Sequence, residues 1–110
     1  MKTVIIIPAR YKSTRFPGKP LALILGKPMI LWVAELCAKA LPVEFVYIAT
    51  DNLKIKEVVE KAGFNVVMTS EKALTGTDRV AEAANQIDAD IYINVQGDEP
   101  LLDPNDILSI

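Results

Sequence analysis

The chain has 110 residues with 12 basic and 14 acidic side chains, so its formal net charge is −2. An apolar fraction of 51% and a charged fraction of 24% are typical of one globular domain and exclude a disordered or low-complexity chain. Cys37 is the single cysteine and there is no histidine, which excludes an intrachain disulfide, a Cys/His zinc site and catalysis by imidazole. Any catalysis must therefore use carboxylates, Lys, Arg, hydroxyls, backbone amides or a hard metal ion.

The longest apolar run near the start covers only residues 4–7 and is ended by Pro8, whereas a membrane-spanning helix needs about 20 residues. Basic residues follow this run where a signal peptide would carry small residues for cleavage. The sequence therefore predicts no transmembrane helix, no membrane partner and a cytoplasmic location.

Charge is distributed unevenly along the chain. Residues 1–34 contain six basic side chains and no acidic one, and the remaining residues carry six basic and fourteen acidic ones, a net charge of −8. A nucleic-acid-binding arm is one interpretation, but the basic residues lack interleaved aromatic residues and the whole chain is acidic, with a pI of about 5.1. We therefore expect the first third to bind a small polyphosphate, not nucleic acid.

The pattern of apolar residues predicts alternating strands and helices. Buried strands are expected at residues 3–7, 44–49, 65–68 and 91–95. Apolar spacings of three and four predict helices at residues 29–40, 54–62 and 77–87. Gly63 is the expected stop signal of the second helix. This alternation is typical of an α/β fold with a Rossmann-like, doubly wound, mostly parallel sheet, whose ligands bind outside the carboxyl ends of the strands.

Three residues outside the candidate site are expected to have structural roles, in helix capping or in the core. Asp51 is expected to cap the second helix, and Trp32 and Cys37 are expected in the core. A further helix start at Asp103 lies close before the last residue, Ile110. This pattern predicts a truncated domain.

A basic segment, residues 8–20, follows the first predicted strand. The chain lacks the G-x-G-x-x-G motif of dinucleotide-binding domains, and neither Gly18-Lys19 nor Gly26-Lys27 is followed by the Ser or Thr of a Walker A motif. The segment carries four cations and two hydroxyls: Arg10, Lys12, Arg15, Lys19, Ser13 and Thr14. Because Arg binds phosphate oxygens bidentately and Lys supplies a mobile charge, the segment suits a triphosphate. A solvated surface loop is the alternative.

A second motif, Gln96-Gly97-Asp98-Glu99-Pro100, comes directly after the fourth predicted strand. Mg²⁺ prefers one or two carboxylates together with phosphate oxygens and water, which makes Asp98 the candidate metal ligand. Gln96 offers a donor and an acceptor to a base or sugar. A tight turn without a binding role is the alternative.

A third motif, Thr75-Gly76-Thr77-Asp78-Arg79, opens the third predicted helix. Thr77 is a candidate N-cap and Arg79 lies in the following turn, so backbone amides and a guanidinium could face one anion. Helix capping alone would also explain Thr77.

The order and spacing of these motifs resemble the 3-deoxy-manno-octulosonate cytidylyltransferases, or CMP-Kdo synthetases, over nearly the whole chain. The matching segments are Ile7-Pro8-Ala9-Arg10, Ser13-Thr14-Arg15, Pro17-Gly18-Lys19-Pro20-Leu21, Gly26-Lys27-Pro28-Met29-Ile30, Ala49-Thr50-Asp51, Gly76-Thr77-Asp78-Arg79 and Val95-Gln96-Gly97-Asp98-Glu99-Pro100. The resemblance implies a nucleotide-diphospho-sugar transferase fold. It also implies Mg²⁺-dependent transfer of CMP from CTP to the anomeric hydroxyl of Kdo, with release of pyrophosphate, for lipopolysaccharide synthesis.

The resemblance further implies roles for individual residues. Together with Thr77, the candidate substrate-binding residues are Pro8, Ala9, Arg10, Ser13, Arg15, Lys19, Arg79 and Gln96. The candidate catalytic residues are Arg10, Arg15, Lys19 and Asp98, with Asp98 as the Mg²⁺ ligand.

Members of that family are more than twice as long as this chain. The resemblance therefore implies that residues 1–110 are the CTP-binding part of one cytidylyltransferase domain. The other half would carry most sugar contacts, a second metal-binding aspartate and the hairpin through which a homodimer forms. Transfer to a related acid sugar, such as an amino-substituted Kdo, stays open, as does a nucleotide-binding module without turnover for the 110 residues alone.

Overall fold

The computed structural model describes residues 2–9, 21–70 and 76–95. Its elements in chain order are β1 (Thr3–Ala9), β2 (Leu23–Ile24), β3 (Lys27–Pro28), α1 (Met29–Ala40), the 3₁₀ turn η2 (Val43–Phe45), β4 (Val46–Thr50), α2 (Leu53–Lys61), β5 (Asn65–Met68), α3 (Gly76–Ala84) and β6 (Ile91–Asn94). Four strands form one parallel sheet in the order β5-β4-β1-β6. The predicted Rossmann-like sheet is confirmed. None of the helices in the described ranges combines the length and apolar character that a membrane crossing requires.

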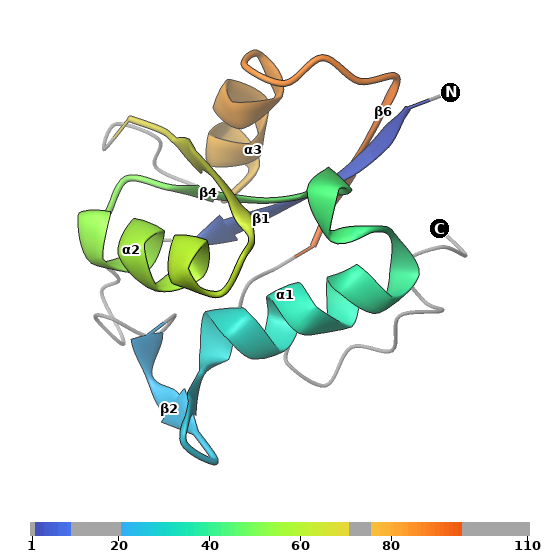
Figure 1. Ribbon diagram of the computed structural model, residues 1–110. Helices are drawn as coiled ribbons and strands as arrows, with labels where there is room; N and C mark the ends of the chain where they lie inside the picture. Colours follow the sequence, from blue (N-terminus) through green and yellow to red (C-terminus); the bar gives the residue numbers. More distant parts are fainter. Residues whose placement is uncertain (1, 10–20, 71–75, 96–110) are drawn as a thin grey trace.

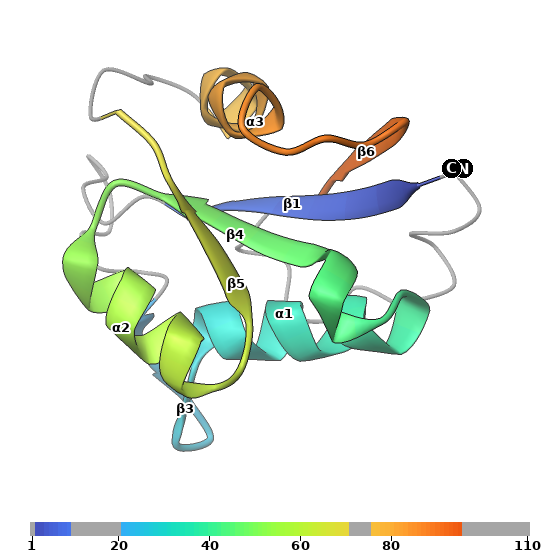
Figure 2. The ribbon, with the colours of Figure 1, turned by 45° about the horizontal axis from the view of Figure 1, so that its top comes forward.

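Helices cover both faces of this sheet. Helices α1 and α2 lie on one side of it and α3 lies on the other (Figures 1 and 2). Successive side chains of β1 point to opposite faces, so Ile5 and Ile7 join the core against α1 and α2, whereas Val4 and Ile6 join the core against α3. Because both faces are covered, β1 is apolar along its length and shows no polar alternation.

Strand β1 is two residues longer than predicted, because it includes Pro8 and Ala9. In a parallel strand, residues i and i+2 direct their backbone groups to the same side, so Pro8 faces the same neighbour as Ile6. Ile6 accepts a hydrogen bond from the Val95 N–H at 3.1 Å, and its partner in the register is Asn94, where the described β1–β6 ladder ends. The missing N–H of Pro8 therefore falls beyond that ladder, where a proline is tolerated.

The other predicted elements differ from the structure mainly at their ends. The exception is β6, for which the sequence predicts a buried strand: all its residues except Ile93 are exposed, because β6 is an edge strand of the described sheet. Helix α1 has the predicted bounds, and Gly63, at φ +91°, follows α2 as predicted. Strand β4 begins two residues later than predicted, because the chain first forms the η2 turn. Helix α3 ends at Ala84, three residues early, where the N–H of Ile87 bonds back to the Ala84 carbonyl at 3.3 Å in a tighter turn.

A short hairpin, β2–β3, precedes α1 and projects away from the sheet (Figure 1). It is absent from the elements predicted above. Trp32 holds it to α1, because its Nε1–H donates to the Ile24 carbonyl at 2.8 Å and the Lys27 ammonium lies 4.3 Å from its ring centroid. The core position expected for Trp32 is therefore wrong, since this side chain is half-buried between helix and hairpin.

The hairpin turn predicts a stabilising substitution. Its two central residues, Leu25 and Gly26, have φ values of +53° and +81°, and Leu25 is 92% exposed. A leucine in the left-handed region is strained, whereas Asn-Gly is the favoured pair for such a turn. We expect Leu25→Asn to raise the free energy of unfolding by about 0.5–1 kcal/mol in urea titrations. Leu23→Asn, an equally polar change at an exposed strand position, should give no gain; an equal gain would contradict the strain argument.

Cys37 lies in the core as predicted, with no exposed surface, and burial raises its pKa from 9.0 to about 12. The unfolded chain thus loses this proton near pH 9 while the folded chain keeps it, so stability is full below pH 9 and falls as pH rises toward 12. Between pH 9.5 and 10.5 we expect stability to fall about 1 kcal/mol further in the wild type than in Cys37→Ala. All other side chains are the same in both proteins, so their contributions cancel in this difference. If the free energy of unfolding falls equally with pH in the wild type and in Cys37→Ala, the assignment of Cys37 as a buried thiol is contradicted.

Candidate functional site

Three strands end level with one another at one edge of the sheet. In the register, Ala9 of β1 lies opposite Thr50 of β4, and Thr50 lies opposite Met68 of β5. The buried Val95 leaves β6 next to β1 through its bond to Ile6. Two of the predicted site residues, Pro8 and Ala9, lie at this edge and are buried. Their role in lining a nucleotide stays a prediction, and burial of both side chains means that backbone atoms would have to fulfil it.

Several predicted site residues lie outside the described ranges: Arg10, Ser13, Arg15, Lys19, Gln96 and Asp98. Their roles stay predictions. Thr77 lies within α3, which begins at Gly76. The prediction that Thr77 is the N-cap is therefore wrong, because the helix already includes the residue before it.

The turn from β4 into α2 is built around Asn52. Its side-chain oxygen accepts hydrogen bonds from the N–H groups of Lys54 and Ile55 at 2.9 and 3.1 Å, and its own N–H donates to Thr50 Oγ1 at 3.2 Å. Asn52 is thus the N-cap of α2, and the prediction of Asp51 for this position is wrong by one residue. The carboxylate of Asp51 is directed to a different partner.

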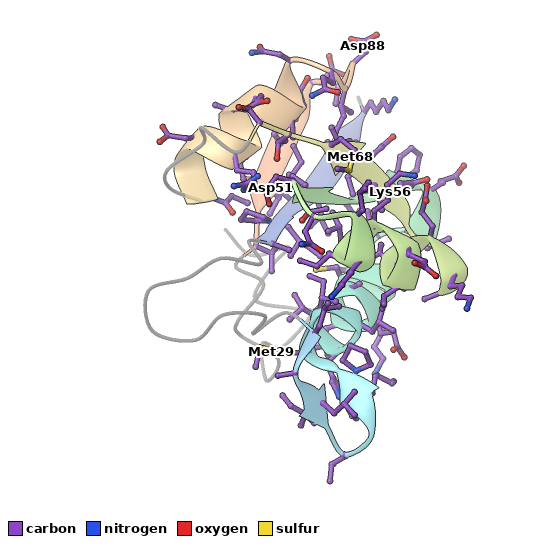
Figure 3. The ribbon with its side chains drawn as sticks, turned by 90° about the vertical axis from the view of Figure 1, so that its left-hand side faces the viewer. Met29, Asp51, Lys56, Met68 and Asp88 are labelled. Atoms are coloured by element: carbon purple, nitrogen blue, oxygen red, sulfur yellow. The ribbon has the colours of Figure 1, made fainter. Side chains whose placement is uncertain are left out.

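That partner is Arg79, the largest fully buried side chain among the described residues, with 1% of its surface exposed. Its Nη1 donates to Thr69 Oγ1 at 2.5 Å and to the Ser70 carbonyl at 3.4 Å, and its Nη2 lies 3.8 Å from Asp51 Oδ2. Asp51, labelled in Figure 3, lies at the end of β4 on the side of α3. One guanidinium therefore joins α3 to the carboxyl ends of β4 and β5.

Two further side chains of α3 and the turn that follows it reach the end of β5. Glu82 Oε1 accepts from the Ser70 N–H at 2.6 Å, and Gln86 Nε2 donates to the Met68 carbonyl at 3.1 Å. With Arg79, these residues are spaced three and four apart, which places them on one helical face. In the described part of the sheet β5 is an edge strand, and these three side chains bind groups of its last residue, Met68, and of the two residues that follow it.

The sequence carries a signal for this arrangement that lies outside the three motifs. Thr69 and Ser70 are polar residues directly after an apolar strand, at the edge where ligands of parallel sheets bind. The predicted site includes the ends of the first and fourth strands and the start of the third helix, and it omits the end of the third strand. Because the contacts of Arg79 depend on that end, its protein partners are missing from the predicted site.

The described residues contain no group of three or more Asp, Glu, His or Cys side chains that could hold a metal ion. Asp51, a carboxylate at the end of β4, is already close to a guanidinium. Asp98, which the sequence predicts as the Mg²⁺ ligand, lies outside the described ranges, so this role stays a prediction.

Comparison with known proteins agrees with the motif pattern. The sequence profile of a family described as "Cytidylyltransferase" matches residues 4–110. The chain is 56% identical over 113 aligned residues to 3-deoxy-manno-octulosonate cytidylyltransferase 2 of Hydrogenovibrio crunogenus, covering 100% of this chain and 46% of that protein. It is 53% identical over 113 residues to 8-amino-3,8-dideoxy-manno-octulosonate cytidylyltransferase of Shewanella loihica, with the same two coverages.

A solved structure is similar as well. The structure of CMP:2-keto-3-deoxy-manno-octonic acid synthetase complexed with CTP superposes with a TM-score of 0.94 at 46% identity, over 99% of this chain and 45% of that one. This similarity confirms the expected fold of the nucleotide-diphospho-sugar transferase type, present in part. The chain spans less than half the length of the curated relatives it matches.

Proposed function

This chain belongs to the cytidylyltransferase family, and from that premise we propose that the whole protein transfers CMP from CTP to 3-deoxy-manno-octulosonate (Kdo), releasing pyrophosphate. The observation that carries the proposal is the high identity, over the full chain, to relatives named for this reaction, one of them solved with CTP. Residues 1–110 would be the CTP-binding part of the cytidylyltransferase domain. A cytoplasmic location and a homodimer stay predictions.

The proposed reaction suits the chemistry of this chain. The anomeric oxygen of Kdo attacks the α-phosphorus of CTP and loses its proton, while the bond from that phosphorus to the bridging oxygen breaks and pyrophosphate leaves. Negative charge spreads over the phosphate oxygens, so positioning and cationic stabilisation supply the catalysis. Arg10, Arg15 and Lys19 would neutralise the triphosphate and Ser13 would donate a hydrogen bond to it. No histidine is required.

The nucleotide would sit at the edge where β1, β4 and β5 end. Pro8 and Ala9 would line it, and Gln96 would contact base or sugar. Asp98 would hold Mg²⁺, which supplies charge stabilisation on the phosphate oxygens when bound. Thr77, in the first turn of α3, would contribute from the helix N-terminus.

Transfer to 8-amino-3,8-dideoxy-manno-octulosonate is the second candidate. It is supported by the relative of Shewanella loihica that carries this name, whose identity to the chain is within 3 percentage points of that of the Kdo-named relative (56% against 53%). Both sugars present the same acid and anomeric groups, so the two candidates share all CTP chemistry and differ in the sugar pocket alone.

Calorimetry and a substrate panel test the proposal. We expect the complete protein to bind CTP, with Mg²⁺ present, at least about 10-fold more tightly than ATP, GTP or UTP, and to release pyrophosphate with Kdo or its 8-amino analogue. The sugar with the larger kcat/KM decides between the two candidates. A preference for another nucleotide would refute cytidylyl transfer, and CTP binding without turnover of either sugar would favour a binding module.

A further inference from the structure

We propose that Arg79 is a positioning residue of the nucleotide site, which fixes the ends of β4 and β5 against α3 without contacting the nucleotide itself. The inference rests on the proposed function and deepens it, because the resemblance alone assigns this arginine to the nucleotide or its phosphates. Three observations support it: the burial of the guanidinium, the origin of its partners, and the charge beside it.

The first observation is burial. Arg79 is 1% exposed, although an arginine is almost never fully buried unless it is paired. An arginine that grips a triphosphate must present its fork to the ligand, as the bidentate geometry requires. Nη1 of Arg79 instead donates to Thr69 Oγ1 and the Ser70 carbonyl, and Nη2 faces Asp51.

The second observation is where these partners come from. Asp51 follows the last residue of β4, Thr69 and Ser70 follow the last residue of β5, and the arginine itself stands in α3. Thr69 extends the pairing of these strands, because its N–H donates to the Thr50 carbonyl at 2.9 Å. A single side chain therefore sets the spacing of three elements at the edge where the nucleotide would bind.

The third observation is the charge. Asp51 Oδ2 lies 3.8 Å from Nη2, and the aspartate side chain is 19% exposed. The carboxylate offsets the positive charge of Arg79 and weakens its attraction for a phosphate. The hydrogen bonds of Glu82 to the Ser70 N–H and of Gln86 to the Met68 carbonyl act on the same segment from the same side. Arg79, Glu82 and Gln86 thus form one set of contacts, and its role is to hold this segment in position.

The test compares CTP with CMP as ligands of the complete protein. The variants are Arg79→Met, Arg79→Lys, Thr69→Val and the double variant Arg79→Met/Thr69→Val. The control is Lys56→Met, which removes a surface cation that pairs with Glu60 at 3.0 Å on α2. Dissociation constants are measured by calorimetry with Mg²⁺ present, and thermal unfolding is recorded for each variant.

Loss of a positioning residue weakens the binding of all ligands of the site by a similar factor. We expect Arg79→Met to weaken the binding of CTP and the binding of CMP by the same factor, about 10-fold or more. Thr69→Val should weaken both in the same ratio, and the double variant should be no weaker than Arg79→Met, because both changes break one contact. Arg79→Lys should not restore binding, since an ammonium cannot bridge Thr69, Ser70 and Asp51 together. Lys56→Met should bind as the wild type does.

Other results would overturn the inference. A loss for CTP several-fold larger than for CMP, or recovery of CTP binding in Arg79→Lys, would make Arg79 a phosphate ligand. A lower melting temperature with unchanged dissociation constants would make it a purely structural residue. If Arg79→Met does not fold, Thr69→Val still tests the contact, since it keeps the buried charge. A wild-type protein that binds no CTP refutes the proposed function first, so the two failures are distinguishable.

Discussion

Replacing Asp98 by asparagine is expected to lower kcat/KM of the complete enzyme by about 100-fold or more, because even changes around a metal ligand cost 10–100-fold. Asparagine keeps the shape and one oxygen acceptor of aspartate but removes the charge that Mg²⁺ requires. The rate of pyrophosphate release at saturating sugar measures the effect. The Mg²⁺ concentration for half-maximal rate should rise at the same time.

Glu99→Gln is the matched control for this prediction, because it removes the neighbouring carboxylate of the same motif. We expect its kcat/KM and its Mg²⁺ dependence to stay close to those of the wild type. If Glu99→Gln is the inactive variant and Asp98→Asn is active, the ligand assignment within this motif is wrong.

The main elements of the fold could be predicted from the sequence because their signals are local. The apolar stretches of β1 and β4 and the spacing of apolar residues in α1, α2 and α3 reflect a sheet whose central strands are covered on both faces. β5 and β6, the edge strands of the described sheet, are less buried but carry the same short apolar runs. The β2–β3 hairpin escaped prediction because strands of two residues have no periodicity. Its turn also places a leucine where asparagine or glycine is usual.

The contacts at the candidate site depend on information that motifs do not contain. Asp51 and Asn52 are both good N-cap residues, and only the backbone path after β4 decides that Asn52 caps α2. That choice leaves the Asp51 carboxylate to face Arg79. The burial of Arg79 likewise follows from the level ends of β4 and β5, which no single segment of the sequence reveals.

Replacing Ile48 by alanine is expected to lower the free energy of unfolding by about 3–4 kcal/mol. Ile48 lies in the middle of β4, between β5 and β1, and none of its surface is exposed. Its side chain belongs to the core against α1 and α2, where Ile5, Val33 and Val59 are also buried. Removing three carbon atoms loses their transfer free energy and leaves a cavity, because the rigid central strands cannot close around it.

Ile91→Ala is the matched control, since it makes the same change on β6, where the side chain is 40% exposed. β6 is an edge strand of the described sheet, so the smaller side chain leaves little cavity and the loss should stay near 1 kcal/mol. Urea unfolding of both variants measures the difference through the midpoint at constant slope. Equal losses would contradict this packing, since they would mean that the central and edge strands contribute alike to the core.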